Sequence, residues 1–370
     1  MVRLKVNLKK KEDLSYIISI GTESIFDILP YITSRLKPSR IGLITDSNLF
    51  KIYKDVIQKL QDKLRVIPFY FSAGEKNKNI QTVLKLFSML TENNFDRKSL
   101  LIAFGGGVVG DITGFLASVY YRGIPFLQIP TSVMAMVDSS IGGKTGVDTE
   151  AGKNLMGTFF QPGAVIINPM YLETLPDKEF LNGFAEIVKH ALIKDEKYFY
   201  FIKSHIEEIL KLDKNVLADI IIKSCNIKKG VVEKDEKEAN LRQILNFGHS
   251  FGHAIEKASM FKIPHGFCVA LGMAAEAYIS VKRGMLKPLE LEEICGLMNR
   301  IGLLKYKKEL LKIPLNKLLK PISHDKKNVG NSINIVFLER IGKVYSKNKI
   351  YSFPVTPDEI KEGYRFLRDL

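Results

Sequence analysis

The chain has 370 residues, of which 46% are hydrophobic and 26% charged, and its formal net charge is +15. This length and apolar content allow two ordinary domains with large cores and exclude a disordered protein. The excess lysine is scattered among Asp and Glu without a nucleic-acid-binding motif. A solvated basic surface is therefore favoured over nucleic-acid binding, and capture of an anionic small substrate is a third interpretation.

Other features of the sequence argue against membranes and disulfides. The sequence has no run of about 18 apolar residues, so we expect no membrane-spanning segment. Residues 1–8 alternate apolar and polar residues like a strand and lack the apolar core of a signal peptide. The three cysteines, Cys225, Cys268 and Cys295, are far apart. They fit neither a disulfide framework nor a CxxC metal site, which predicts a protein of the reducing cytoplasm.

In chain order, the first half alternates apolar strands with helices. Strands are expected at residues 41–45, 66–71, 100–104, 126–129 and 165–167. Amphipathic helices are expected at residues 48–63 and 80–90. This alternation is typical of a Rossmann-like, mostly parallel sheet with helices on both faces.

The pattern changes to helical periodicity after about residue 176. Helices are expected at residues 178–194, 198–210, 216–233, 245–258, 267–282 and 290–301, with a short extended segment at 333–338. The sequence therefore predicts an α/β domain over residues 1–176 and an all-α domain over residues 177–370. Because the connection is short, we expect the two domains to share an interface, where a cleft is the default place for a ligand.

A glycine-rich turn, GGGVVGD, occupies residues 105–111 between a strand and a helix. Glycines let a phosphate approach the backbone, and the helix N-terminus offers free N–H groups. The spacing departs from the dinucleotide fingerprint GxGxxG, so a tight structural turn remains the alternative. Asp46 and Asn48 follow an earlier strand and could contact a ribose or adenine, although capping of the next helix is the simpler interpretation.

Two lysines and an amide lie among glycines between residues 142 and 157. The segment before Lys144 evokes a phosphate-binding loop but lacks its first glycine, which disfavours an NTPase. Lys144, Lys153 and Asn154 could still form the wall of a site for an anionic substrate, with solvated loop lysines as the alternative.

Two histidines, His249 and His253, lie four positions apart within the segment NFGHSFGH, and His265 follows. Four residues is about one helical turn, so both rings should leave the same helix face. Clustered imidazoles suit a transition metal such as zinc, and Glu186 is a candidate carboxylate ligand. The alternative is that two core histidines share a helix by coincidence.

Several of these blocks together resemble the 3-dehydroquinate synthase family. The blocks are residues 105–111, 137–148, 183–189 and 246–254 and the segment Asp325-Lys326-Lys327, and they occur in the family's order. The resemblance implies an N-terminal NAD-binding α/β domain and a helical metal domain. It also implies conversion of 3-deoxy-D-arabino-heptulosonate 7-phosphate to 3-dehydroquinate and phosphate, with NAD and one divalent metal, zinc or cobalt.

The resemblance also implies roles for individual residues. Metal ligands fall on Glu186, His249 and His265, and His253 becomes a neighbour that faces the substrate. NAD contacts fall on Asp46, Asn48, Glu75, Lys78, Gly105, Gly106, Gly107, Asp111, Thr131, Ser132, Lys153, Tyr171, Thr174 and Asn182. Substrate contacts fall on Asp138, Lys144, Asn154, Lys189, Lys228, Glu238, Arg242, Asn246, His253 and one of Lys326 and Lys327. The residues expected to act in catalysis are Lys144, Asn154, Lys189, Arg242, Asn246 and His253. Arg122 matches an arginine that the family contributes across a homodimer interface.

The implied chemistry explains this choice of residues. Transient oxidation of a substrate alcohol needs NAD and acidifies the neighbouring C–H before phosphate leaves, and the substrate phosphate itself can serve as the base. Lysines and an arginine neutralise the carboxylate and the departing phosphate.

One position departs from the family. The family commonly has Glu after His-Gly, whereas this chain has Phe267 after Gly266. The missing carboxylate could be one that supports a metal ligand. A metal- and NAD-dependent polyol dehydrogenase and another sugar-phosphate cyclase are the alternatives. Lys228 and Asn246 favour the dehydroquinate branch.

Overall fold

The computed structural model describes residues 13–23, 25–323 and 333–370. Within them, six parallel strands form one sheet in the order β1-β8-β5-β4-β2-β3. These strands are β1 (Ile17–Ile20), β2 (Ile41–Asp46), β3 (Val66–Phe71), β4 (Leu100–Gly105), β5 (Phe126–Pro130) and β8 (Ala164–Ile167). The chain order reverses between β2 and β4, and open sheets bind ligands at such a point, beyond the carboxyl ends of the strands.

Helices cover both faces of this sheet. Leu43 and Ile102 face α1 (Ile25–Leu36) and α3 (Lys54–Leu64) in one core cluster, whereas Ile44 faces α4 (Ile80–Glu92) and α5 (Gly107–Val119) in the other. Burial on both faces explains why the strands are continuous apolar runs rather than alternating ones. The prediction of a parallel sheet between helical layers is confirmed.

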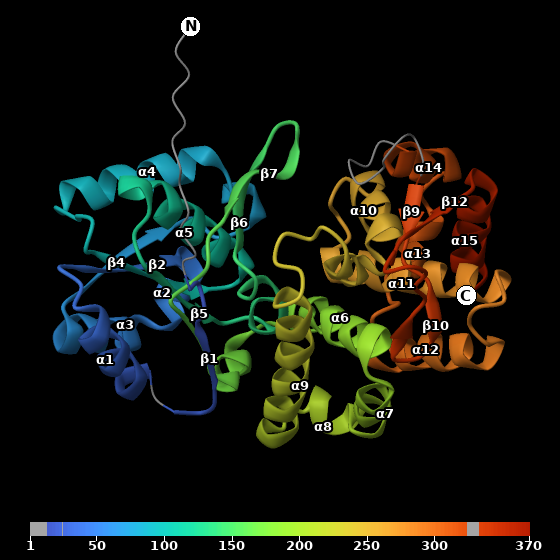
Figure 1. The fold of residues 1–370 in the computed structure, drawn as a ribbon, viewed down its shortest axis with the longest axis horizontal. Helices are drawn as coiled ribbons and strands as arrows, with labels where there is room; N and C mark the ends of the chain where they lie inside the picture. The colour runs from blue at the N-terminus through green and yellow to red at the C-terminus, as the bar shows by residue number, and fades with distance from the viewer. Residues whose placement is uncertain (1–12, 24, 324–332) are drawn as a thin grey trace, which may run out of the picture.

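The second half is built from helices around α11 (His265–Lys282), which packs against α6 (Asp177–Lys194), α10 (His249–Ala258), α12 (Pro288–Ile301) and α15 (Pro357–Asp369). Figure 1 shows this helical half beside the sheet half. The other helices are α7 (Glu196–Ser204), α8 (Ile206–Leu210), α9 (Lys214–Val232), α13 (Lys307–Leu311) and α14 (Leu315–Ser323). Short antiparallel pairs join β9 (Ile333–Ile335) to β12 (Phe353–Val355) and β10 (Leu338–Arg340) to β11 (Lys343–Val344).

Some predicted boundaries change. The helix expected at 48–63 is two helices, α2 (Ser47–Ile52) and α3, because Tyr53 between them leaves helical geometry at φ −106° and ψ 26°. The helix expected at 198–210 likewise divides at His205 into α7 and α8. The helix expected from residue 245 begins at His249, after a separate turn, Leu241–Asn246. The strand expected at residues 1–8 lies outside the described residues.

An antiparallel hairpin was not predicted. The segment read as glycine-flanked loops forms β6 (Lys144–Thr149) and β7 (Gly152–Phe159). Gly146 faces Gly157 across it, and a Cβ on Gly146 would lie 2.6 Å from Met156 O, so the two backbones approach as only glycine allows. The hairpin projects beside the helical half (Figure 1).

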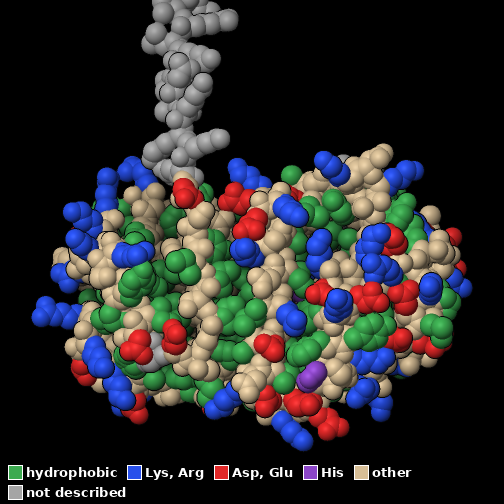
Figure 2. All heavy atoms as spheres, turned by 60° about the horizontal axis from the view of Figure 1, so that its bottom comes forward, with side chains coloured by type: hydrophobic (Ala, Val, Ile, Leu, Met, Phe, Trp, Pro, Cys, Tyr) green, Lys and Arg blue, Asp and Glu red, His purple; other side chains and the backbone are tan. Residues whose placement is uncertain are grey.

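The surface supports the sequence-based interpretation of charge. Figure 2 shows Lys and Arg side chains scattered over one face, with Asp and Glu between them. Among the described helices, none is both long and apolar enough to cross a membrane.

Candidate active site

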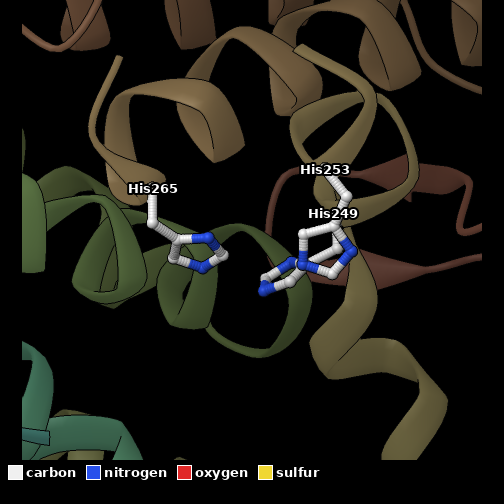
Figure 3. Close-up of side chains that lie close together, drawn as sticks. All are labelled: His249, His253 and His265. Carbon is white, nitrogen blue, oxygen red and sulfur yellow. The ribbon is translucent and has the colours of Figure 1, made fainter. Parts of the chain in front are cut away.

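Three histidines come together between α10 and α11. His249 and His253 lie one turn apart on α10, and His265 is the first residue of α11. Their candidate ligand nitrogens lie within 4.8 Å of one another. Figure 3 shows the three side chains approaching from the two helices. All three are partly exposed rather than packed in the core, which favours a ligand site over a coincidence of core histidines.

Glycines set the close approach of these two helices. Gly248, at φ 80°, precedes His249, and its N–H donates to Glu276 Oε2 at 2.9 Å. A Cβ on Gly272 of α11 would lie 2.0 Å from Gly248 O, and one on Gly252 would lie 3.0 Å from Val269 Cα. The backbone therefore places the histidines of α10 beside His265.

Glu186 completes the cluster from α6. Its side chain is 1% exposed, Oε2 pairs with Lys189 one turn further along, and Oε1 lies 3.8 Å from His249 Nε2. Zinc binds carboxylate oxygen and imidazole nitrogen at about 2.0–2.2 Å, so two ligand atoms on one ion lie no more than about 4.4 Å apart. The separation of Glu186 and His249 fits that limit. The choice of His249 and His265 as ligands, with His253 as a neighbour, stays a prediction, because the nitrogens of all three histidines lie within the same 4.8 Å of one another.

Three buried cations lie near Glu186 and Asp138. Lys189, Lys228 and Arg242 are each at most 6% exposed. Lys228 Nζ binds Asp138 Oδ1 at 2.5 Å, and Lys189 is paired with Glu186. The Arg242 side chain instead donates to the carbonyl oxygens of Gly142 and Glu236. Lys189 and Lys228 thus have carboxylate partners, whereas Arg242 is held by carbonyl oxygens. Because a buried cation without a matching charge is costly, the Arg242 end of this group is suited to an anion.

His190, which the sequence-based predictions did not include, is buried beside these charges. Its Nε2 lies 3.8 Å from Asp138 Oδ1, and Asp138, Glu186 and His190 form a second group with ligand-capable atoms. Burial, followed by the positive charge of Lys189, lowers the pKa of His190 to about 3. Burial raises the pKa of Asp138, but Lys228 and Lys189 outweigh it and hold that pKa well below its usual range. His190 is therefore neutral and Asp138 ionised near pH 7.

Glu238 joins two more predicted substrate residues. It forms an ion pair with Lys144 of β6, and its Oε1 accepts from Asn246 Nδ2 at 2.7 Å. Lys144 belongs to the sheet half and Asn246 to the helical half, so this carboxylate joins the two halves.

The glycine turn lies where a dinucleotide is expected. Gly105 ends β4, Gly107 begins α5, and Thr131 N donates to Gly105 O at 3.0 Å from the neighbouring strand end. Asp46 Oδ1 accepts from Asn48 N at 2.8 Å and from Leu49 N at 3.1 Å. The capping role of Asp46 is thus present, and its contact with NAD stays a prediction, as does that of Ser132 and Gly106 in the same region.

Lys78 connects the glycine turn to the hairpin. It is 5% exposed, and Nζ lies 2.6 Å from Asp111 Oδ2 and 2.5 Å from Asn154 Oδ1. Burial lowers the pKa of Lys78, but Asp111 and Glu75 outweigh it and leave that pKa above its ordinary value. Two predicted cofactor residues and one predicted substrate residue therefore bond to one another.

Lys153 reaches from the hairpin to the histidine cluster. Its Nζ lies 2.7 Å from Glu256 Oε1 and 3.8 Å from Glu75 Oε1. Glu256 Oε2 lies 3.3 Å from His265 Nδ1. Sequence reasoning missed Glu256, although it follows His249 and His253 at helical spacing i+7 and i+3 and so shares their face.

The remaining predicted cofactor residues have structural partners. Tyr171 packs its ring against Tyr53 and Phe104, with centroids 5.3 and 5.4 Å away, and Thr174 Oγ1 lies 2.7 Å from Tyr53 OH. Asn182 Oδ1 accepts from Gly266 N at 2.7 Å, beside His265.

Two other predictions are not linked to the histidine cluster by any contact of the described residues. Arg122 lies in the turn Tyr120–Arg122, and no hydrogen bond or ion pair among the described residues joins it to the histidines. Lys326 and Lys327 lie outside the described residues.

Phe267, the position that departs from the family, points into the core. It is fully buried, its ring lies 4.9 Å from that of Tyr306, and Lys305 Nζ lies 4.6 Å above its ring. An apolar side chain suits this buried position, so having Phe267 where the family commonly has Glu affects the packing of the core near His265.

Comparisons with known proteins agree with this geometry. The family described as 3-dehydroquinate synthase N-terminal matches residues 68–182, and the one described as 3-dehydroquinate synthase C-terminal matches residues 183–328. The chain is 42% identical over 347 residues to a 3-dehydroquinate synthase of Acetivibrio thermocellus, covering 93% of this chain and 94% of the relative.

Solved structures share the fold. A 2-epi-5-epi-valiolone synthase from Streptomyces hygroscopicus, with NAD+ and Zn2+ bound, aligns with a TM-score of 0.84 at 24% identity, over 98% of this chain and 99% of that one. A 2-deoxy-scyllo-inosose synthase complexed with carbaglucose-6-phosphate, NAD+ and Co2+ aligns with a TM-score of 0.82 at 25% identity, over 94% and 96%. With both family matches and relatives of this identity along most of its length, the chain belongs to the 3-dehydroquinate synthase family.

Proposed function

We propose that this chain is a 3-dehydroquinate synthase, a lyase that converts 3-deoxy-D-arabino-heptulosonate 7-phosphate to 3-dehydroquinate and phosphate. The observation that carries the proposal is that Glu186 joins the histidine cluster to buried cations. One of its oxygens lies 3.8 Å from His249 Nε2 and the other pairs with Lys189, and Lys228 and Arg242 are buried as well. A neutral polyol has no use for these cations, whereas a phosphorylated sugar acid needs them. They therefore favour the synthase over a polyol dehydrogenase of the same fold.

The residues present fit a divalent metal, zinc or cobalt, and NAD. Glu186, His249 and His265 would hold the metal, and the strand ends carrying Asp46 and the glycine turn would hold NAD. When bound, the metal polarises the substrate carbonyl, and NAD stores the hydride removed from the substrate alcohol.

The chain's own side chains bind and orient the substrate. Lys189, Lys228 and Arg242 neutralise its carboxylate and phosphate, and because they are already desolvated their attraction for an anion is strong. His253 lies beside the metal cluster and would move a proton at a substrate hydroxyl. Asn154, Asn246 and Lys144 would orient hydroxyl groups on the wall of the cleft.

Phosphate release tests the proposal. Purified protein supplied with NAD and Co2+ should release inorganic phosphate from 3-deoxy-D-arabino-heptulosonate 7-phosphate without net formation of NADH. Absence of phosphate release from protein with confirmed bound metal would overturn it. Accumulation of NADH with a polyol would instead identify a dehydrogenase.

A homodimer in the cytoplasm is part of the proposal. Arg122 lies next to exposed apolar side chains, Val119, Tyr121 and Phe159, which are 43–49% exposed. Ser118 and Thr158 bond at 3.0 Å, which joins α5 to β7 in one surface. A second copy of the chain would cover these side chains and bring Arg122 to its active site.

Subunit mixing tests that arrangement. Arg122→Ala and His249→Ala dimers should each be inactive, and mixing them after dissociation should restore activity, because one site then combines an intact metal cluster with an intact arginine. No restoration in mixed dimers would show that Arg122 acts within its own chain or not at all.

A further inference from the structure

Glu256 lies between the histidine cluster and the hairpin, and none of the roles above uses it. It is 5% exposed, near the end of α10. Oε1 binds Lys153 Nζ at 2.7 Å, and Oε2 lies 3.3 Å from His265 Nδ1. Burying a carboxylate is costly unless its oxygens are paired, and both oxygens of Glu256 are.

The contact decides which nitrogen His265 presents. A carboxylate accepts but cannot donate, so Nδ1 of His265 must carry the proton. Nε2 is then left with its lone pair, which is the form that binds a metal.

His249 shows the same arrangement. Its Nδ1 lies 3.2 Å from Phe247 O, a carbonyl that also only accepts, and its Nε2 is the nitrogen 3.8 Å from Glu186. Both predicted histidine ligands therefore have Nδ1 held by an oxygen, and in His249 the Nε2 nitrogen faces Glu186.

We propose that Glu256 is a positioning residue that fixes the tautomer and ring orientation of His265 for metal binding and ties that ring, through Lys153, to the β6–β7 hairpin. The inference rests on the proposed metal site. Carboxylates that hold a metal-ligating histidine usually matter 10- to 100-fold in metal affinity, and the same size is expected here.

The test is Co2+ binding by Glu256→Gln, measured by calorimetry on metal-stripped protein and by the visible absorption of bound cobalt. We expect the affinity to fall about 10- to 100-fold and the cobalt spectrum to change, because glutamine can rotate its amide and offers no charge to the imidazole. Glu256→Asp keeps the charge but shortens the side chain, so its cobalt affinity should lie between those of the unaltered protein and Glu256→Gln.

Ser259→Ala is the matched control on the same helix end. Ser259 Oγ donates to Glu256 O at 2.9 Å and accepts from Ile263 N at 3.4 Å, and neither bond involves the Glu256 carboxylate or the His265 ring. Its loss should therefore perturb the helix end and the following turn without changing cobalt affinity. Thermal unfolding of the metal-free variants separates a positioning role from a structural one. A structural role would lower the unfolding temperature of a variant together with its cobalt affinity, whereas a positioning role would lower the cobalt affinity alone.

The outcomes are distinguishable. If Glu256→Gln binds cobalt as the unaltered protein does, with the same spectrum, the inference is wrong and the metal site stands. If the unaltered protein binds no cobalt, the proposed metal site itself is wrong. An equal loss of affinity in Ser259→Ala would show that helix stability, rather than the carboxylate, governs binding.

Discussion

Replacing Gly272 with alanine tests whether the spacing of α10 and α11 sets the metal site. The added methyl carbon would lie 2.0 Å from Gly248 O and 2.8 Å from Gly252 N, whereas ordinary contact begins at 3.4 Å. The helices must therefore separate by roughly 1.4 Å, the difference between 3.4 and 2.0 Å. Both opposing atoms belong to the backbone of the neighbouring helix, so no side chain can rotate away.

Overpacking of this kind costs about 1–3 kcal/mol, and the backbone contacts place it near the upper end. Alanine has a higher helix propensity than glycine, which offsets this cost by about 1 kcal/mol. We expect a net loss of about 2 kcal/mol in the free energy of unfolding. Metal bonds of about 2.0–2.2 Å do not stretch to span the added separation, so metal affinity should fall at least about tenfold.

Urea unfolding and cobalt calorimetry are the assays, with Gly296→Ala of α12 as the control. A Cβ on Gly296 has no heavy atom within 4 Å, so this variant should gain up to about 1 kcal/mol and bind cobalt normally. Unchanged cobalt affinity and stability in Gly272→Ala would refute the reasoning.

Three further predictions concern the cluster and its surroundings. His249→Ala should lose metal and phosphate release together, whereas His253→Ala should keep its metal and turn over slowly; equal metal loss by elemental analysis would contradict the assignment. The pKa of His190 is lowered to about 3 in the folded protein, so as pH falls the unfolded chain binds a proton at this histidine first. The folded state therefore loses stability between about pH 6.5 and pH 3, by up to about 1.4 kcal/mol per pH unit. His190→Gln should flatten that slope in urea unfolding, and an unchanged slope would exclude His190 as its source. Lys78→Met should lower the free energy of unfolding by about 3–5 kcal/mol, because it leaves Asp111 buried without its partner, and adding Asp111→Leu should recover part of the loss.

Much of the fold follows from local pattern. The strands β2, β4, β5 and β8 are almost fully buried, so their apolar runs are easy to recognise, and β3 has the predicted bounds. The edge strand β1 is partly exposed and was not predicted. Helix ends were less predictable because single residues decide them, as Tyr53 and Gly248 show. The β6–β7 hairpin was not predicted, because its glycines were interpreted as loop residues. In the structure these glycines permit the close approach of the two strands.

The site was predictable in its parts more than in its connections. Residue spacing placed His249 and His253 on one face, with Glu186 as a candidate ligand, and resemblance added Lys189 and Lys228. The contact of Lys153 with Glu256 joins the sheet half to the helical half across a long stretch of sequence, and no local pattern predicts it. His190 was missed for a related reason: its burial comes from tertiary packing against Asp138.

The buried cations Lys189, Lys228 and Arg242 also bear on how the proposed reaction would end. If they bind the substrate as proposed, phosphate would be released among the same cations, so the attraction that speeds capture would slow departure of the product. Inorganic phosphate should compete with the substrate. Because salt screens exposed charges more than buried ones, added salt should slow substrate entry more than it speeds phosphate release. We therefore expect turnover at saturating substrate to depend on how tightly these cations hold phosphate.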